Sequence, residues 1–295
     1  MLAAADGGAV LPAAPPPLLP ATRAVPHWGA REAARALDVA AALLDRDLGA
    51  ATLVREVSTV VFRVGDLAAK VHPPAADAER HRGVYAALSA TTSTLRPVAG
   101  PVPTPHGVVS LWPWCAGPGA IGWPEIGALL RRFHDETASI GALVSVPVPP
   151  WRPLSRLPEQ VAGLDPATAA ALLEARDRLV AAAGDLRSDL GHGVIHGDVS
   201  AENALRAASG DPVLIDLDFV ATGPREYDLV GAYLRLRAGE ISPSTYDAFC
   251  AAYGADVRSW DGLPLVTDIC ELGALTFSLW MGGPAPASGA PSVSR

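Results

Sequence analysis

Two short apolar runs, each followed within three residues by an aspartate, constrain this chain more than any other feature. The first, Val194-Ile195, leads into His-Gly-Asp, and Asn203 comes five residues after that aspartate. The second, Leu214-Ile215, leads into Asp216-Leu217-Asp218, with its first acid thirteen residues beyond Asn203. A short apolar run bounded by glycine and polar residues is typical of a buried strand. We therefore expect two neighbouring strands that end in a cluster of carboxylates and one amide.

This spacing of oxygen-bearing side chains suits phosphoryl transfer. That reaction needs a carboxylate to orient and deprotonate the attacking hydroxyl, and oxygen ligands that hold Mg²⁺ against the phosphates. Asp198 and Asn203, five apart on one loop, can serve these two roles if the loop curls around a cleft. Asp216 on the neighbouring strand can supply a further metal ligand. Mg²⁺ keeps several waters, so two or three protein oxygens are enough.

The pattern HGDxxxxN followed by IDxD resembles the aminoglycoside phosphotransferase family, small-molecule kinases of the protein-kinase-like superfamily that also holds choline and fructosamine kinases. The resemblance implies that Asp198 is the catalytic base and that His196 shapes the catalytic loop. It also implies that Asn203 and Asp216 are metal ligands. Asp218 would add a water-mediated metal contact.

A later stretch extends the resemblance. Residues 223–229, GPREYDL, are similar to the family pattern G-D-P-x-x-D-L, with no aspartate between the glycine and the proline. The last acid of that pattern, here Asp228, would brace the catalytic loop by hydrogen bonds.

The amino-terminal part carries the expected phosphate-binding elements. Residues 58–64 resemble the strand–turn–strand that covers the nucleotide phosphates in this family, and Ser58 and Thr59 would supply hydroxyl or backbone N–H donors. Lys70 falls on the third strand, where superfamily members carry the lysine that holds the α- and β-phosphates. Glu79, on the following helix, is the expected ion-pair partner of Lys70.

The resemblance covers about residues 50–282 and implies an α+β, two-lobed protein-kinase-like fold, with Mg²⁺ and ATP or GTP bound between the lobes. Ser110 and Trp112 lie where the interlobe hinge would offer backbone groups to the purine. The expected segments are a disordered leader at 1–26, a β-rich lobe at 27–110, a hinge at 111–114, a helical catalytic lobe at 115–283 and a disordered tail at 284–295. Because relatives often continue their last helix further, a missing substrate contact at the carboxyl end is a possibility that the sequence leaves open.

Two residue types occur once each in the chain, and both fall on these positions. Of 23 basic residues, 22 are arginine, and Lys70 is the single lysine; Asn203 is the single asparagine. A compact ammonium differs physically from the planar guanidinium fork. A lysine kept against so strong an arginine bias indicates a position where arginine cannot do the work.

Bulk composition excludes several other classes. A net charge of −8 argues against a sequence-independent nucleic-acid binder, which needs a basic surface. Three cysteines without a CxxC pair predict free thiols rather than a disulfide framework or a thiolate metal site. The sequence has no run of about 18 uninterrupted apolar residues, so we do not expect a membrane span. The amino terminus does not resemble a secretory signal, so we expect a cytoplasmic protein. The oligomeric state is not indicated.

The acid content suggests a class of acceptor. From Asp198 onward there are 13 acidic and 6 basic residues, which predicts a negative field around the cleft and favours cationic acceptors such as aminoglycosides, hence a role in antibiotic resistance. Asp268 and Glu271, on the last predicted helix, are the first acids to test. Two alternatives stay open: a kinase of choline-like or sugar-amine metabolites, and a non-catalytic nucleotide-binding pseudokinase.

Overall fold

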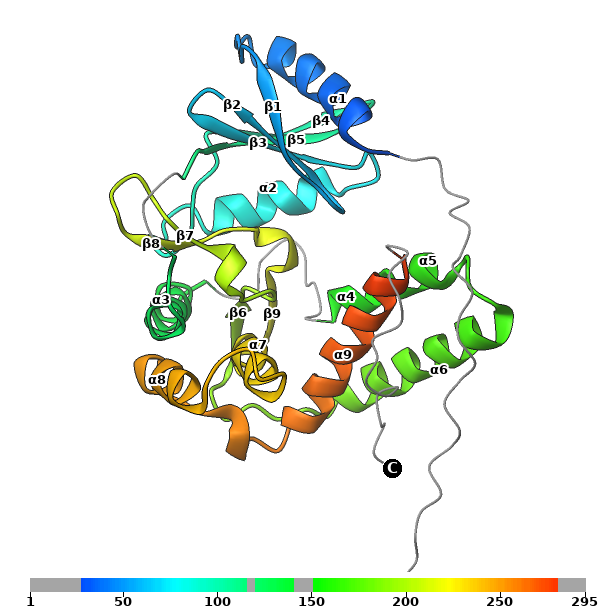
Figure 1. Cartoon of the computed structure of the whole chain (residues 1–295), viewed down its shortest axis with the longest axis vertical. Coiled ribbons are helices and arrows are strands. Elements are labelled where there is room, and N and C mark those ends of the chain that lie inside the picture. The colour runs from blue at the N-terminus through cyan, green and yellow to red at the C-terminus, as the bar shows by residue number, and fades with distance from the viewer. Residues whose placement is uncertain (1–27, 116–119, 141–150, 281–295) are drawn as a thin grey trace, which may run out of the picture.

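The computed structural model describes residues 28–115, 120–140 and 151–280, so the predicted leader and tail lie outside the described residues. Figure 1 shows a strand-rich part stacked on a larger helical part, with helix α2 lying between them. The predicted two-lobed α+β arrangement is confirmed.

The amino-terminal lobe is built on one antiparallel sheet with the strand order β1-β2-β3-β5-β4. Its strands are β1 (Ala51–Glu56), β2 (Val60–Val64), β3 (Leu67–His72), β4 (Ala99–Thr104) and β5 (Gly107–Pro113). Helix α1 (Ala30–Leu43) covers one face, because its buried stripe of Ala33, Ala36, Leu37 and Ala40 packs on apolar residues of β2, β3 and β5. Strand β3 lies in the middle of the sheet, where Lys70 pairs in register with Ser110 of β5.

Strand β4 did not figure in the sequence interpretation, because its sequence AGPVPT does not resemble a strand. Pro101 and Pro103 cannot donate to a ladder, and proline is therefore confined to edge strands. The structure places β4 at the edge of the sheet, where β5 is its only strand partner among the described residues.

The carboxyl-terminal lobe consists mainly of helices around one apolar core. Phe133 and Leu130 of α3, Ile195 of β6, and Tyr246 and Phe249 of α8 lie in that core. A second cluster joins α4, α5, α6 and α9 through Leu154, Leu157, Leu179, Ile269 and Leu272. Its helices are α3 (Trp123–Glu136), α4 (Arg152–Ser155), α5 (Leu157–Val161), α6 (Pro166–Ala183), α7 (Tyr227–Arg237), α8 (Pro243–Tyr253) and α9 (Leu263–Trp280). Helix α2 (Ala78–Ala87) belongs to the amino-terminal lobe, where it contacts β4.

Two small antiparallel pairs carry the polar segments to one place. Strand β6 (His192–Ile195) pairs with β9 (Ala221–Pro224), and β7 (Ala204–Arg206) pairs with β8 (Pro212–Leu214). Asn203 directly precedes β7, and Asp216 follows β8 by two residues. Because Ala204 is opposite Leu214 in the register, both polar residues emerge at the same end of the hairpin.

Helix α9 is long and apolar enough to cross a membrane by length and composition alone. It carries Asp268 and Glu271, and its other face packs against α5 and α6, so it fits the core helix of a folded lobe.

Candidate active site

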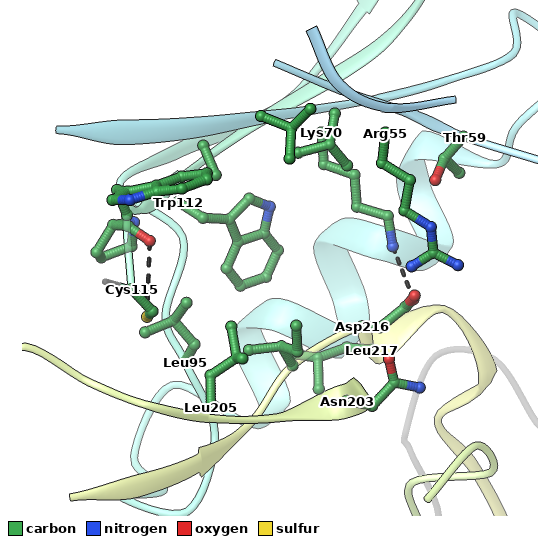
Figure 2. Close-up of a pocket in the computed structure, with 16 residues that line it drawn as sticks. Arg55, Thr59, Lys70, Leu95, Trp112, Cys115, Asn203, Leu205, Asp216 and Leu217 are labelled. Atoms are coloured by element: carbon green, nitrogen blue, oxygen red, sulfur yellow. Dashed lines mark hydrogen bonds and ion pairs between the residues drawn. The ribbon is translucent and has the colours of Figure 1, made fainter. Parts of the chain in front are cut away.

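A cavity of about 240 Å³ opens between the sheet and the helical lobe. Figure 2 shows Lys70 and Arg55 descending from the sheet toward Asp216, with Leu95, Leu205 and Leu217 below the opening. The lining residues are Val54, Arg55, Thr59, Val61, Ala68, Lys70, Leu95, Trp112, Pro113, Trp114, Cys115, Asn203, Leu205, Ile215, Asp216 and Leu217. This lining is apolar at one end and charged at the other, as a site for a base and its phosphates requires.

Lys70 dominates the charged end of the cavity. Its ammonium lies 2.7 Å from Oδ1 of Asp216 and 2.8 Å from Oδ2 of Asp218, with only 12% of the side chain exposed. Burial by itself lowers the pKa of Lys70, but the charges of Asp218 and Asp216 outweigh it and raise the pKa well above its usual value. The lysine is therefore a permanent cation at the place where phosphates would enter.

Asp216 has an unusual backbone. Its φ of 62° and ψ of 64° are left-handed, a conformation that non-glycine residues seldom adopt. The chain around it is held on both sides, since Ile215 N donates to Asn203 O at 2.9 Å and Leu217 begins a short 3₁₀ turn. Strained backbone of this kind is retained where it aims a functional side chain.

Asp198 and Asn203 are joined directly. Asn203 Nδ2 donates to the Asp198 carbonyl oxygen at 2.9 Å and to Asp198 Oδ2 at 2.8 Å. Figure 2 shows the amide oxygen of Asn203 turned toward the carboxylate of Asp216. Protein atoms that exclude water from the carboxylate raise the pKa of Asp198. The neighbouring His196 opposes this rise, while the charge of Asp216 adds to it.

The loop that carries Asp198 is braced from beneath by buried side chains. Asp228 accepts hydrogen bonds from His196 N at 2.7 Å and Gly197 N at 2.8 Å, and its third contact is His134 Nε2 at 3.0 Å. His196 links the loop to the second strand, because its Nε2 lies 2.8 Å from Ile215 O while its Nδ1 accepts from Asp198 N at 3.3 Å. His196 therefore bridges the loop that carries Asp198 and the segment that carries Asp216.

Two expected contacts are not found. Glu79 lies on the outer face of α2, with its side chain 83% exposed and paired with Arg82, so it is not the partner of Lys70. Ser110 is buried against α2, where its hydroxyl lies 3.4 Å from Tyr85 Oη, and it does not line the cavity. The residues of the expected hinge region that line the cavity are those from Trp112 to Cys115, which directly follow Ser110 and Leu111.

Asp218 and Ser58 also differ from expectation. Both oxygens of Asp218 are directed at the amino-terminal lobe, toward Lys70 and His72, rather than toward Asn203. The expected outer metal contact of Asp218 is therefore not supported. Thr59 lines the cavity, whereas its neighbour Ser58 does not.

The apolar lining was not found from the sequence. Leu95, Leu205 and Leu217 lie on three separate segments that meet only in the folded chain. Two backbone hydrogen bonds join the segment of Leu95 to the strand that precedes Asp216: Leu95 N donates to Leu214 O at 3.0 Å, and Leu214 N donates to Ser93 O at 2.8 Å. A single leucine in a loop carries no signal of this kind in the sequence.

The residues present fit a metal–nucleotide complex. Asn203 and Asp216 offer the hard oxygen ligands that Mg²⁺ prefers, and Lys70 offers the cation that phosphates require. A bound Mg²⁺ would neutralise phosphate charge. The chain itself supplies a carboxylate, that of Asp198, which is hydrogen-bonded to the cavity residue Asn203.

Comparisons with known proteins agree with this geometry. A family model described as "Phosphotransferase enzyme family" matches residues 49–263. A comparison with curated protein sequences finds no significant match. Among solved structures, choline kinase LicA from Streptococcus pneumoniae is similar at a TM-score of 0.60 and 12% identity, with 84% of this chain and 90% of that chain covered.

Two further structures show the same fold. A choline/ethanolamine kinase family protein from Mesorhizobium loti has a TM-score of 0.59 and 16% identity, over 84% of this chain and 85% of that chain. An amicoumacin kinase in complex with AMP-PNP, Ca²⁺ and Ami has a TM-score of 0.59 and 15% identity, over 83% and 85%. The expected kinase-like fold is thus confirmed.

Proposed function

This chain belongs to the phosphotransferase enzyme family, and within it we propose a Mg²⁺-dependent kinase that moves the γ-phosphoryl of ATP or GTP to a hydroxyl of a small cationic molecule. One observation carries this proposal. Lys70, Asn203 and Asp216 line a single cavity, and Asp198 is bonded to one of them. We expect it to work in the cytoplasm, where nucleoside triphosphates are available.

Each residue has a separate role in the proposed reaction. Asp198 accepts the proton of the acceptor hydroxyl and aims that oxygen at the γ-phosphorus. Lys70 neutralises phosphate oxygens, and Asn203 and Asp216 hold the metal. His196 and Asp228 touch no substrate and keep the loop in place. Thr59, in the turn after β1, lies where its groups can contact phosphate.

The acceptor is proposed to be cationic because of the acids near the catalytic loop. The first half of α9 carries Asp268 and Glu271, and Cys270 between them packs against the apolar core that contains Ile195 and Val199, on either side of Asp198. Asp268 is on the same part of the helix, and partial burial together with the Glu271 charge raises its pKa. Glu271 is paired with Arg237 at 3.0 Å, which leaves Asp268 as the stronger candidate for a cation.

The structural relatives favour amine-bearing alcohols without choosing one. Their names include choline, ethanolamine and amicoumacin kinases, so a metabolite kinase and a resistance enzyme both remain compatible with the site. A nucleotide-binding pseudokinase is the third candidate. The presence of all four residues that the proposed chemistry requires, Lys70, Asp198, Asn203 and Asp216, argues against it.

The test is product mass spectrometry on a panel of choline-like, aminoglycoside and neutral polyol acceptors with Mg²⁺ and either ATP or GTP. Asp198→Ala should abolish transfer and leave nucleotide binding measurable. Asp261→Ala, an exposed aspartate of the same lobe, is the matched control and should keep wild-type rates. Transfer at an unchanged rate by the Asp198 variant would refute the base assignment. Turnover of neutral acceptors alone would remove the cationic class, and nucleotide binding without any transfer would favour the pseudokinase.

A further inference from the structure

Two groups of the amino-terminal lobe contact the carboxylate of Asp218 directly, and a third lies just beyond hydrogen-bond distance. Lys70 Nζ lies 2.8 Å from its Oδ2, and His72 Nε2 lies 2.9 Å from Oδ2 and 3.1 Å from Oδ1. His81 Nε2 is 3.6 Å from Oδ1. Lys70 and His72 are two residues apart on β3, so their side chains leave the same face of the strand.

Helix α2 faces this cluster with a histidine rather than an acid. His81 is 2% exposed, and its ring lies 4.5 Å from the His72 ring and 6.0 Å from the Tyr85 ring, measured between centroids. Glu79, two residues earlier, is about 200° away around the helix and faces solvent. The face of α2 that is turned toward Lys70 therefore carries no carboxylate that could pair with it.

The same helix is tied to the segment that carries Asp218. Arg80 Nη2 donates to the carbonyl oxygen of Val220 at 2.8 Å, in a buried position. Thus α2 and β3 of one lobe both bind residues 218–220 of the other. These contacts are independent of the cavity lining, since neither histidine borders the cavity.

We propose that His72, with His81 behind it, is a positioning residue that holds the Asp218 carboxylate against Lys70, so that Asp218 fills the ion-pair role first expected of Glu79. The inference rests on the proposed function in one respect, the contact of Lys70 with phosphate. Asp216 is then left to the metal, while Lys70 keeps one fixed acid that aims its ammonium into the cavity. Loss of the His72 donor frees the carboxylate to rotate and lets Lys70 follow it.

A metal ion is the competing occupant of this cluster. His72, His81 and Asp218 each offer one ligand atom, all within 4.8 Å of one another. The ammonium of Lys70, bonded to the same carboxylate, opposes a second cation there. The hydrogen-bonded arrangement is therefore the one that the charges favour.

The test compares His72→Gln with His72→Asn in the full chain. Glutamine places an amide donor near the position of Nε2, whereas asparagine is one bond too short to reach Asp218. We expect His72→Asn to weaken binding of Mg²⁺ and a non-hydrolysable ATP analogue about tenfold, as for loss of a hydrogen bond to a charged group. His72→Gln should stay within about threefold of wild type, and Glu79→Gln should be unchanged.

A double-mutant cycle separates positioning from general loss of structure. In a Lys70→Met background, His72→Asn should cost no more than about twofold, because the group that it positions is gone. An equal loss in both backgrounds, or wild-type affinity of His72→Asn, overturns the inference. So does stoichiometric Zn²⁺ binding by the wild type that His72→Asn abolishes. If Lys70→Met itself binds nucleotide as wild type does, the proposed function fails instead.

Discussion

Replacing Asp228 by alanine should remove a large part of the stability of the folded chain. The residue is 2% exposed, and its carboxylate accepts from the backbone N–H groups of His196 and Gly197 at 2.7 and 2.8 Å. Truncation leaves two backbone donors and the His134 ring without this partner, and each orphaned buried donor costs about 1–3 kcal/mol. Allowing for partial relaxation, we expect a loss of about 3–5 kcal/mol in the free energy of unfolding, against roughly 5–15 kcal/mol for a typical domain.

Urea unfolding followed by tryptophan fluorescence measures this loss. Asp228→Asn keeps one oxygen acceptor and should lose about 1–3 kcal/mol, because one of the two backbone donors then faces an amide NH₂ group. Asp261→Ala, on the surface, should stay within about 0.5 kcal/mol of wild type. If Asp228→Ala unfolds within about 1 kcal/mol of wild type, the carboxylate is not the brace of the catalytic loop.

Three further predictions follow from the site and its supports. Gly197→Ala should impair folding and activity, because Gly197 has a φ of +82° and an added Cβ would clash with Phe219 O. Circular dichroism measures the folded fraction and a binding assay the nucleotide affinity; wild-type values of both would contradict the prediction. Burial alone would lower the pKa of Lys70, but two carboxylates raise it, which keeps the amine protonated. Acylation of this single lysine at pH 9 should therefore be slower in the folded chain than in urea; peptide mass spectrometry measures both rates, and equal rates refute the ion pairs. Burial would raise the pKa of Glu136, but hydrogen bonds from residues 92–93 lower it, so the carboxylate contributes about 1 kcal/mol to the free energy of unfolding above its ordinary pKa, and this contribution disappears as the pH falls through the lowered value. Glu136→Gln should therefore lose that stability at pH 7 and little of it at pH 3, and a loss independent of pH would contradict this.

Much of the fold was predictable because local patterns and tertiary packing agree. The helical spacing of apolar residues between Trp28 and about Leu48 predicts a helix, and the structure has α1 there at Ala30–Leu43. The Gly65-Asp66 pair predicts a tight turn between two strands, and β2 and β3 form that hairpin, with Val64 opposite Leu67. Elements of three to six residues were missed, namely β4, β7, β9, α4 and α5. So short a segment has too few residues to show a period, and β4 is further disguised by its prolines.

The sequence by itself determined the family of this protein and the reaction that we propose for it. The order and spacing of Asp198, Asn203 and Asp216 around two apolar strands, with one lysine upstream, specify the family and the residues that would act, because spacing along a strand–loop–strand is a local property.

Only the tertiary structure decided which groups support them. Whether Glu79 or His81 faces Lys70 depends on the rotation of α2 against the sheet, and two residues of difference turn a side chain from solvent to core. The pairing of Asp218 with β3 depends on how closely the two lobes approach. Such contacts join residues about 140 positions apart, and no local pattern encodes a distance across that span.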